Sequence, residues 1–399
     1  MTSTMNREIW ITGIGLVTSQ GEGRDAHWAA LSQGAAPIVD ATGIAPFPVH
    51  PLPPLALDKQ IPRKGDQRQM EPWQRLGTYA AGLAIDDAGA RSLVSEMHLV
   101  VAAGGGERDI AVDEAIATEL AEVPDAKAGP LLNERLANGL RPTLFLAQLS
   151  NLLAGNISIV HGVTGSSRTF MGEESAAADA LRIAHARLAE GRGEIALVGG
   201  ALVAQRWDMA LLYAPGGAML RGDFAPVSAR RGGGAVMGGM AAFLVLEHAE
   251  HAKARGARGI ARLAGVASDA TRRATAGEAT AAAQRLLAKL PVAAAPLGVM
   301  SAETGAAPAT AEEEAFLAGL PDATVRRAGS VIGHGIEAGF PAQVALAAIA
   351  LDQGGFYPPL DPADTPSGAT PRQVLVTGFG IFRGEALALL QPASQEKAA

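Results

Sequence analysis

The sequence predicts an α/β protein whose sheets are largely parallel. Apolar, β-branched runs repeatedly end in glycines, and helical patterns alternate with these runs along the chain. The same alternation occurs in the first and in the second part of the sequence. Strands that end in glycine turns and alternate with helices are typical of parallel sheets, in which functional residues gather at the carboxyl ends of the strands.

The first element is a strand over 9–17 (IWITGIGLV), because its residues are apolar or β-branched and include the glycines of a turn. Six prolines between 46 and 62 predict an irregular excursion over 43–62. The other elements expected in the first part are helices over 27–31, 73–87, 176–190 and 249–255, and strands over 99–103, 194–199 and 241–247. Those expected in the second part are strands over 296–300 and 373–376, and helices over 312–317 and 341–351.

Composition limits the functions that the chain can have. With 399 residues, 48% of them hydrophobic, the chain can bury one large or two medium cores. A net charge of −7 gives no electrostatic basis for binding nucleic acid. The absence of cysteine excludes disulfides, thiolate metal sites and a thiol nucleophile. The eight histidines show no metal-ligand spacing, so we expect neither a metal nor a cofactor.

Targeting and membrane signals are also missing from the sequence. The start of the chain lacks the basic and then apolar pattern of a signal peptide. No apolar run approaches the roughly 18 residues that a membrane span needs. We therefore expect a cytoplasmic protein without a membrane span.

Several segments together resemble the elongating, type II β-ketoacyl-[acyl-carrier-protein] synthases. The matches follow the family's order and are 11–18 (ITGIGLVT), 70–89 (MEPWQRLGTYAAGLAIDDAG), 150–162 (SNLLAGNISIVHG), 194–201 (EIALVGGA), 241–256 (AAFLVLEHAEHAKARG), Gly333-His334 with Gly339, and Gly378-Phe379-Gly380. The resemblance covers nearly the whole chain and implies a thiolase fold, a five-layer αβαβα arrangement built from two related halves. It places the halves at 1–250 and 251–399 of one compact unit, and it implies a two-fold dimer formed around 156–169.

The resemblance also locates the family's condensing site, whose nucleophile is a cysteine at a helix start. The helix dipole lowers the pKa of a thiol at that place. The position of this cysteine falls on Glu174, or on Glu173 if the register slips by one. The first catalytic histidine is replaced by Glu303, and the second is kept as His334. Because a carboxylate is a poor acyl acceptor and repels the malonyl carboxylate, we interpret these positions as vestigial.

Two further losses are implied around this site. Five residues before the second histidine the family has a lysine, where this chain has Gly329, and the lysine's glutamate partner is replaced by Gly239. Losing both members of a buried ion pair avoids stranding one charge, which would cost roughly 3–5 kcal/mol. We expect His334 to hydrogen-bond Glu174 or Glu303, which would plug the place of the acyl group.

Each of these residues also has a simpler explanation. Glu174 can be an ordinary glutamate in the first turn of a helix, and a lone histidine such as His334 is usually structural. Phe379 matches the family's gate to the acyl pocket, but in a Gly-Phe-Gly turn it can equally be a core aromatic. A basic cluster that could contact the acidic carrier protein, or could simply be solvated, comprises Arg63, Lys64 and Arg68.

The leading hypothesis is a non-condensing homologue that acts as a chain-length-factor-like partner of an active ketosynthase. Such a heterodimer would work with acyl carrier protein in fatty-acid, very-long-chain lipid, polyketide or aryl-polyene biosynthesis. One alternative is an enzyme of altered chemistry that uses Glu174, Glu303 and His334 in acyl or malonyl hydrolysis or decarboxylation. The other alternative is a homodimeric acyl-binding protein. The family consists of acyltransferases, but this chain alone is not expected to condense.

Overall fold

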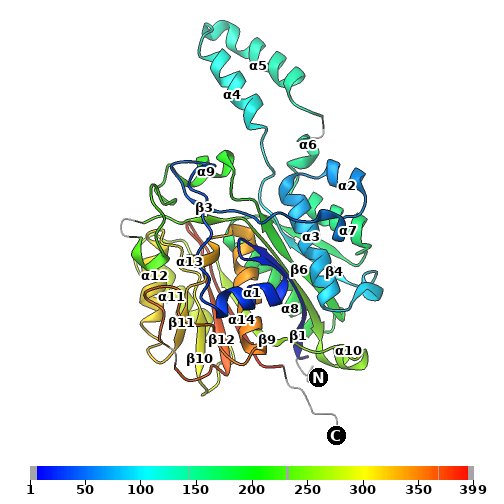
Figure 1. The fold of residues 1–399 in the computed structure, drawn as a ribbon, viewed down its shortest axis with the longest axis vertical. Coiled ribbons are helices and arrows are strands. Elements are labelled where there is room, and N and C mark those ends of the chain that lie inside the picture. Colours follow the sequence, from blue (N-terminus) through cyan, green and yellow to red (C-terminus); the bar gives the residue numbers. More distant parts are fainter. Residues whose placement is uncertain (1–6, 143, 231–232, 367, 394–399) are drawn as a thin grey trace.

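The computed structural model describes residues 7–142, 144–230, 233–366 and 368–393, and its centre is a mixed sheet made of two sets of strands (Figure 1). In sheet order, the first set is β5 (Ser167–Phe170), β4 (His98–Ala102), β6 (Ile195–Leu202), β8 (Met240–His248) and β1 (Ile9–Thr18). The second set is β11 (Thr324–Arg326), β10 (Leu297–Met300), β12 (Gln373–Phe379), β13 (Glu385–Gln391) and β9 (Ala261–Asp269). When the strands of each set are numbered in chain order, both sets show the same order across the sheet: third, second, fourth, fifth and first. The fold therefore consists of two related halves.

The two sets of strands join at β1 and β9, where Trp10 and Ile11 pair with Arg262 and Ala261 in antiparallel register. Within each set only the fifth strand, β8 or β13, runs against its neighbours. The expectation of largely parallel sheets is therefore wrong for these two strands. In the second set the reason is the short turn over 380–384 between β12 and β13, because a parallel neighbour needs a much longer crossover.

Helices complete five layers around the strands. Helices α8 (Glu174–Ala189) and α14 (Gly339–Asp352) lie between the two sets, where α8 contacts β6 and β9 and α14 contacts β8 and β12. Many of their buried residues are alanines, which let helices and strands approach closely. The outer layers are α3 (Pro72–Asp87) and α7 (Leu152–His161) on the first set, and α11 (Glu278–Leu287) and α12 (Ala309–Leu317) on the second. This arrangement confirms the thiolase fold predicted from the sequence.

Shorter elements surround these layers. They are the helices α1 (Gly23–Ser32), α2 (Lys64–Gln69), α6 (Leu144–Ala147), α9 (Trp207–Tyr213), α10 (Ala249–Ala254) and α13 (Gly329–Ile332), the strands β2 (Gly21–Glu22), β3 (Val49–His50) and β7 (Met237–Gly238), and 3₁₀ turns at Leu57–Lys59, Arg91–Leu93, Val227–Ala229 and Ile336–Ala338. Each strand and helix expected from the sequence has an observed counterpart. Helices α4 (Ile110–Leu120) and α5 (Asp125–Gly139) were not expected; they pack on each other and project from the body (Figure 1).

None of the helices within the described residues is both long and apolar enough to cross a membrane. Residues 1–6, on which the expected lack of a signal pattern partly rests, lie outside the described residues. The cytoplasmic location stays a prediction.

Candidate functional site

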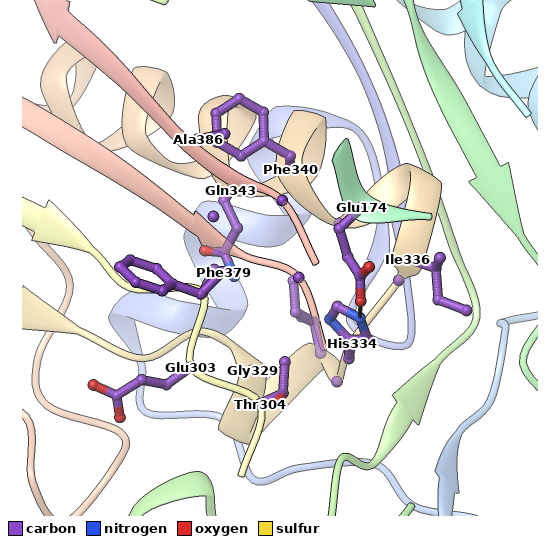
Figure 2. A pocket seen from close by; sticks show the side chains of 18 of the residues that line it. Glu174, Glu303, Thr304, Gly329, His334, Ile336, Phe340, Gln343, Phe379 and Ala386 are labelled. Carbon is purple, nitrogen blue, oxygen red and sulfur yellow. Dashed lines mark hydrogen bonds and ion pairs between the residues drawn. The ribbon is translucent and has the colours of Figure 1, made fainter. Parts of the chain in front are cut away.

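Glu174 is the first residue of α8, and its side chain points toward the second half of the chain (Figure 2). Gly172 makes the turn from β5 into α8 with φ 142°, a backbone conformation that L side chains rarely adopt. Only 9% of Glu174 is exposed. Its Oε1 accepts a hydrogen bond from Nε2 of His334 at 2.8 Å and another from the N–H of Ile381 at 3.2 Å. The structure thus contains the expected hydrogen bond between Glu174 and His334.

His334 is fixed by its own backbone on the other side of this pair. Its N–H donates to the carbonyl of Val236, and its carbonyl accepts from the N–H of Gly238. The preceding Gly333 has φ 76°, and a Cβ on it would lie 2.9 Å from the backbone of Gly238. Because only glycine tolerates this approach, the direction of the imidazole is set by the packing of the backbone.

The electrostatics of the pair keep Glu174 ionised. Burial alone would raise the pKa of Glu174, but the hydrogen bond and the electrostatic attraction of His334, together with the N–H of Ile381, outweigh it. The pKa of Glu174 therefore lies below its usual value of 4.5. Its Oε2 is buried and has no hydrogen-bond partner among the described residues. A carboxylate stabilised in this way is both a weak base and a weak nucleophile.

Glu303 follows β10, and its carboxylate points away from the Glu174–His334 pair (Figure 2). Arg327 binds both of its oxygens, with Nε 2.7 Å from Oε2 and Nη2 3.2 Å from Oε1. Burial raises the pKa of Glu303, and Arg327 opposes this rise only in part. Among the described residues, His334 makes no hydrogen bond to Glu303. Of the two acids expected as partners of His334, only Glu174 forms the hydrogen bond, because Arg327 holds Glu303 instead.

Glu313 of α12 fixes the loop that carries Glu303. Its Oε1 accepts hydrogen bonds from the hydroxyl of Ser301 at 2.7 Å, the N–H of Ala302 at 3.0 Å and the hydroxyl of Thr377 at 2.6 Å. Burial, and then the neighbouring charge of Glu303, raise the pKa of Glu313 to about 7. Glu313 was not predicted from the sequence. Its hydrogen bonds hold the backbone of the loop after β10 in place.

The two positions that the resemblance assigns to the family's lysine and glutamate, Gly329 and Gly239, are tightly packed. A Cβ on Gly329 would lie 3.0 Å from the carbonyl oxygen of Glu303. A Cβ on Gly239 would lie 2.8 Å from Cγ of Leu52. A larger side chain at either place would therefore require the neighbouring atoms to shift.

Glu174, Glu303, His334 and Phe379 line one small cavity. Its volume is about 30 Å³, which has room for about two water molecules and none for an acyl thioester. Phe379 packs on Phe316 with ring centroids 6.0 Å apart and is 3% exposed, so it is a core aromatic that also borders the cavity. Its role as a gate stays a prediction. The side chains of Glu174 and His334 thus fill most of the space between the two halves at this place.

A larger cavity of about 650 Å³ lies on the other side of the segment that follows His334. Ile336 borders both cavities, so this segment forms the wall between them. The lining of the larger cavity comes from the glycine turn 104–106, from α9 and from Glu337. Exposed apolar side chains that also line this cavity are Met171, Leu212 and Phe382, with 70%, 73% and 49% exposure.

The other candidates lie at the surface. Glu173, the alternative position for the nucleophile, pairs with Arg383 at 2.9 Å and does not reach His334. In the basic cluster, Lys64 pairs with Asp58 at 2.6 Å. The described part of the chain contains no group of three or more His, Asp or Glu side chains arranged to hold a metal ion.

Comparison with known proteins identifies the family. The sequence profile of the β-ketoacyl synthase N-terminal domain matches residues 6–252, more than half of the chain. The chain belongs to the β-ketoacyl synthase family. This β-ketoacyl synthase homologue is 27% identical over 213 residues to 3-oxoacyl-[acyl-carrier-protein] synthase 2 of Rhizobium meliloti (strain 1021). That match spans 49% of this chain and 46% of the relative, about half of the length of each.

Solved structures resemble this β-ketoacyl synthase homologue over nearly its full length. The ishigamide ketosynthase/chain length factor has a TM-score of 0.79 at 20% identity, covering 98% of this chain and 100% of that one. AntDE:AntF, a type II polyketide synthase acyl-carrier protein in complex with its ketosynthase bound to the hexaketide, has a TM-score of 0.72 at 17% identity, covering 98% and 100%. At these identities the likeness shows the fold, which is the thiolase fold of ketosynthases.

Proposed function

We propose that this β-ketoacyl synthase homologue is a non-condensing partner subunit of an active ketosynthase. The observation that carries the proposal is the hydrogen bond to His334, beside a cavity of about 30 Å³, of Glu174, the residue to which the resemblance assigns the nucleophile's position. The sequence has no cysteine that could accept an acyl group as a thioester. The scaffold around this inert site keeps the family's fold, as a subunit with a supporting role requires.

The larger cavity supports a role in accommodating an acyl chain. Its volume of about 650 Å³ lies within the range of about 300–1,000 Å³ typical of ligand pockets. The exposed Met171, Leu212 and Phe382 line it. Exposed apolar side chains that cluster at an opening mark contact surfaces. A partner that covers them would close the cavity into a tunnel for the growing chain, which is the role of a chain length factor.

The edge of the first sheet supports assembly with such a partner. Among the described residues, β5 pairs with β4 and leaves its other edge free, and its first residues Ser167 and Arg168 are exposed. On α7, which contacts β5, the side chain of Ile159 is 70% exposed. A free strand edge beside an exposed apolar side chain is suited to a two-fold contact, through which a diverged copy can pair with its relative. We propose a heterodimer in preference to a homodimer, working with acyl carrier protein.

The experiment is purification of the full chain from its native host, followed by mass spectrometry of what is bound to it and by sedimentation. We expect an equimolar complex with a ketosynthase that has its cysteine. Ile159→Glu should abolish the complex without unfolding the chain, because this side chain is exposed. Val292→Glu is the matched control, since Val292 is 39% exposed in the second half of the chain. A monomer would overturn the proposal, and a stable homodimer without a ketosynthase would favour the acyl-binding alternative.

The alternative of altered catalytic chemistry has no observation in its favour. It needs Glu174, Glu303 and His334 to act together, but the carboxylate of Glu303 is bound by Arg327 and that of Glu174 by His334. The lowered pKa of Glu174 makes it a weak base, and the ion pair with Arg327 directs the carboxylate of Glu303 away from His334. The acyl product, whether fatty acid, very-long-chain lipid, polyketide or aryl polyene, is left open by the proposal.

A further inference from the structure

Glu337 is a buried acid that lines the larger cavity and plays no part in the Glu174–His334 pair. Only 7% of Glu337 is exposed. Its Oε1 lies against Gly104 so closely that a Cβ on this glycine would collide with it. Apart from the N–H of its own residue, none of the described residues donates a hydrogen bond to this carboxyl group. The acid therefore occupies the space that a side chain at position 104 would need, at the wall of a cavity otherwise lined largely by glycine turns and α9.

The backbone before Glu337 is strained. Ile336 has φ 43° and is the only non-glycine residue with positive φ among the described residues. A β-branched residue is unfavourable in this region and persists only where the surrounding structure imposes it. The consequence is a chain that presents His334 to the small cavity and Glu337, three residues later, to the large one. The unfavourable conformation of Ile336 thus directs the side chain of Glu337 into the larger cavity, away from His334.

The charges that face Glu337 leave it able to donate or to accept a hydrogen bond. Burial, and after it the charges of Glu174 and Glu173, raise its pKa to about 7, while the N–H of its own residue and the charge of Arg206 oppose the rise. Other charged groups that line the same cavity are Arg108 and Asp208. Arg206 pairs with Asp208 at 2.6 Å and Arg108 pairs with Asp113, so neither arginine offers an unpaired positive charge to an anionic ligand. A neutral polar group is the better match for this acid.

We propose that Glu337 makes the larger cavity selective for an acyl chain that carries a ketone or hydroxyl oxygen at the level of Gly104. This inference rests on the proposed function in one respect, that an acyl chain enters this cavity. A plain methylene chain would cover the carboxyl group and leave it with no partner beyond the N–H of its own residue, so its remaining hydrogen-bonding capacity would be lost at a cost in binding free energy. Sites built around a buried polar group reject analogues that lack the matching group. An oxygenated chain satisfies the carboxyl group while its methylenes contact the apolar lining.

The test compares matched chains on the full-length protein by titration calorimetry. The probes are the decanoyl thioester of N-acetylcysteamine and its 3-oxo, 5-oxo and 7-oxo derivatives. The ketone is placed at three positions because its distance from the thioester decides whether it reaches Glu337. We expect at least one oxo chain to bind on the order of tenfold more tightly than the plain chain, the effect of one hydrogen bond. Glu337→Gln should keep the preference, because an amide also donates, and Glu337→Leu should abolish it without weakening the plain chain.

A pH series separates this role from a merely structural one. A ketone only accepts hydrogen bonds, so the preference of the wild type should fall between pH 6 and pH 8 as Glu337 ionises, whereas that of Glu337→Gln should stay constant. Equal affinities for all four probes, a preference that survives in Glu337→Leu, or binding of none of the probes would each overturn the inference. Failure of the proposed function would instead be seen as loss of the ketosynthase complex, which these titrations do not measure.

Discussion

Glu174 and His334 stand 160 residues apart in the sequence, one in each half of the fold, and their side chains meet at 2.8 Å. In a condensing member of the family this is where an acyl group on sulfur would meet the second histidine. Here the carboxylate and the imidazole satisfy each other, and about 30 Å³ of space is left between the two halves. The Glu174–His334 pair is thus a buried contact that joins the two halves of the fold.

The first prediction concerns the stability that this contact supplies. Glu174→Ala removes one partner of a buried pair and should lower the free energy of unfolding by about 3–5 kcal/mol. Glu173→Ala is the matched control, because its partner Arg383 is exposed and its loss should change stability little. Denaturant unfolding of both variants measures the difference. Equal effects of the two substitutions would show that the Glu174–His334 pair is not a stabilising contact.

The second prediction concerns the chemistry of the site. Glu174→Cys should not restore condensation, because the resemblance assigns a catalytic histidine to Glu303, which Arg327 holds, and a lysine to Gly329, which has no side chain. The assay incubates the variant with acyl- and malonyl-carrier protein and looks for a ketoacyl product by mass spectrometry. Detection of that product above the wild-type background would show that the site is less altered than its geometry indicates.

The third prediction tests the ion pair that replaces the lost histidine. Arg327→Met should destabilise the protein by about 3–5 kcal/mol, because it leaves the buried carboxylate of Glu303 without its partner. The double variant with Glu303→Met should recover most of this loss, since two apolar side chains can replace a buried pair. Unfolding of both single variants and of the double variant completes the cycle. A double variant as unstable as Arg327→Met would show that the loss of stability does not come from an unpaired Glu303 carboxylate.

The fourth prediction follows from the raised pKa of Glu337. Between its ordinary pKa of 4.5 and about 7 in the folded protein, the folded state keeps a proton that the unfolded state has lost. Stability from this group is therefore present below pH 4.5 and lost as the pH rises to about 7. Relative to wild type, Glu337→Gln should gain stability over this window, by at most about 3 kcal/mol. A difference in unfolding free energy that does not change with pH would refute the shift.

The sequence predicted Glu174 and His334 together because the matched segments preserve their order, and because glycine turns mark where strands and helices begin. It did not predict the partner of Glu303. Arg327 lies 24 residues further along, and only its side-chain direction decides whether it reaches the carboxylate. A signal was present, since Arg326 and Arg327 stand three and two residues before Gly329, the position that the resemblance assigns to the family's lysine.

Glu337 and the α4–α5 hairpin show a second limit of the sequence. A glutamate in a short turn ordinarily faces water, and the burial of Glu337 depends on Gly104 from the other half of the fold. No local pattern reports such a contact. In the hairpin, the absence of a strong apolar stripe is consistent with two helices that pack mainly on each other, away from the core.

The most direct test of the central claim asks where the acyl group resides in the assembled complex. The complex purified from the native host is incubated with acyl-carrier protein, and each chain is then weighed as an intact protein by mass spectrometry. The account predicts a mass increase by one acyl group on the ketosynthase partner and an unchanged mass for this chain. An acyl group on this chain, above all at Glu174, would contradict it.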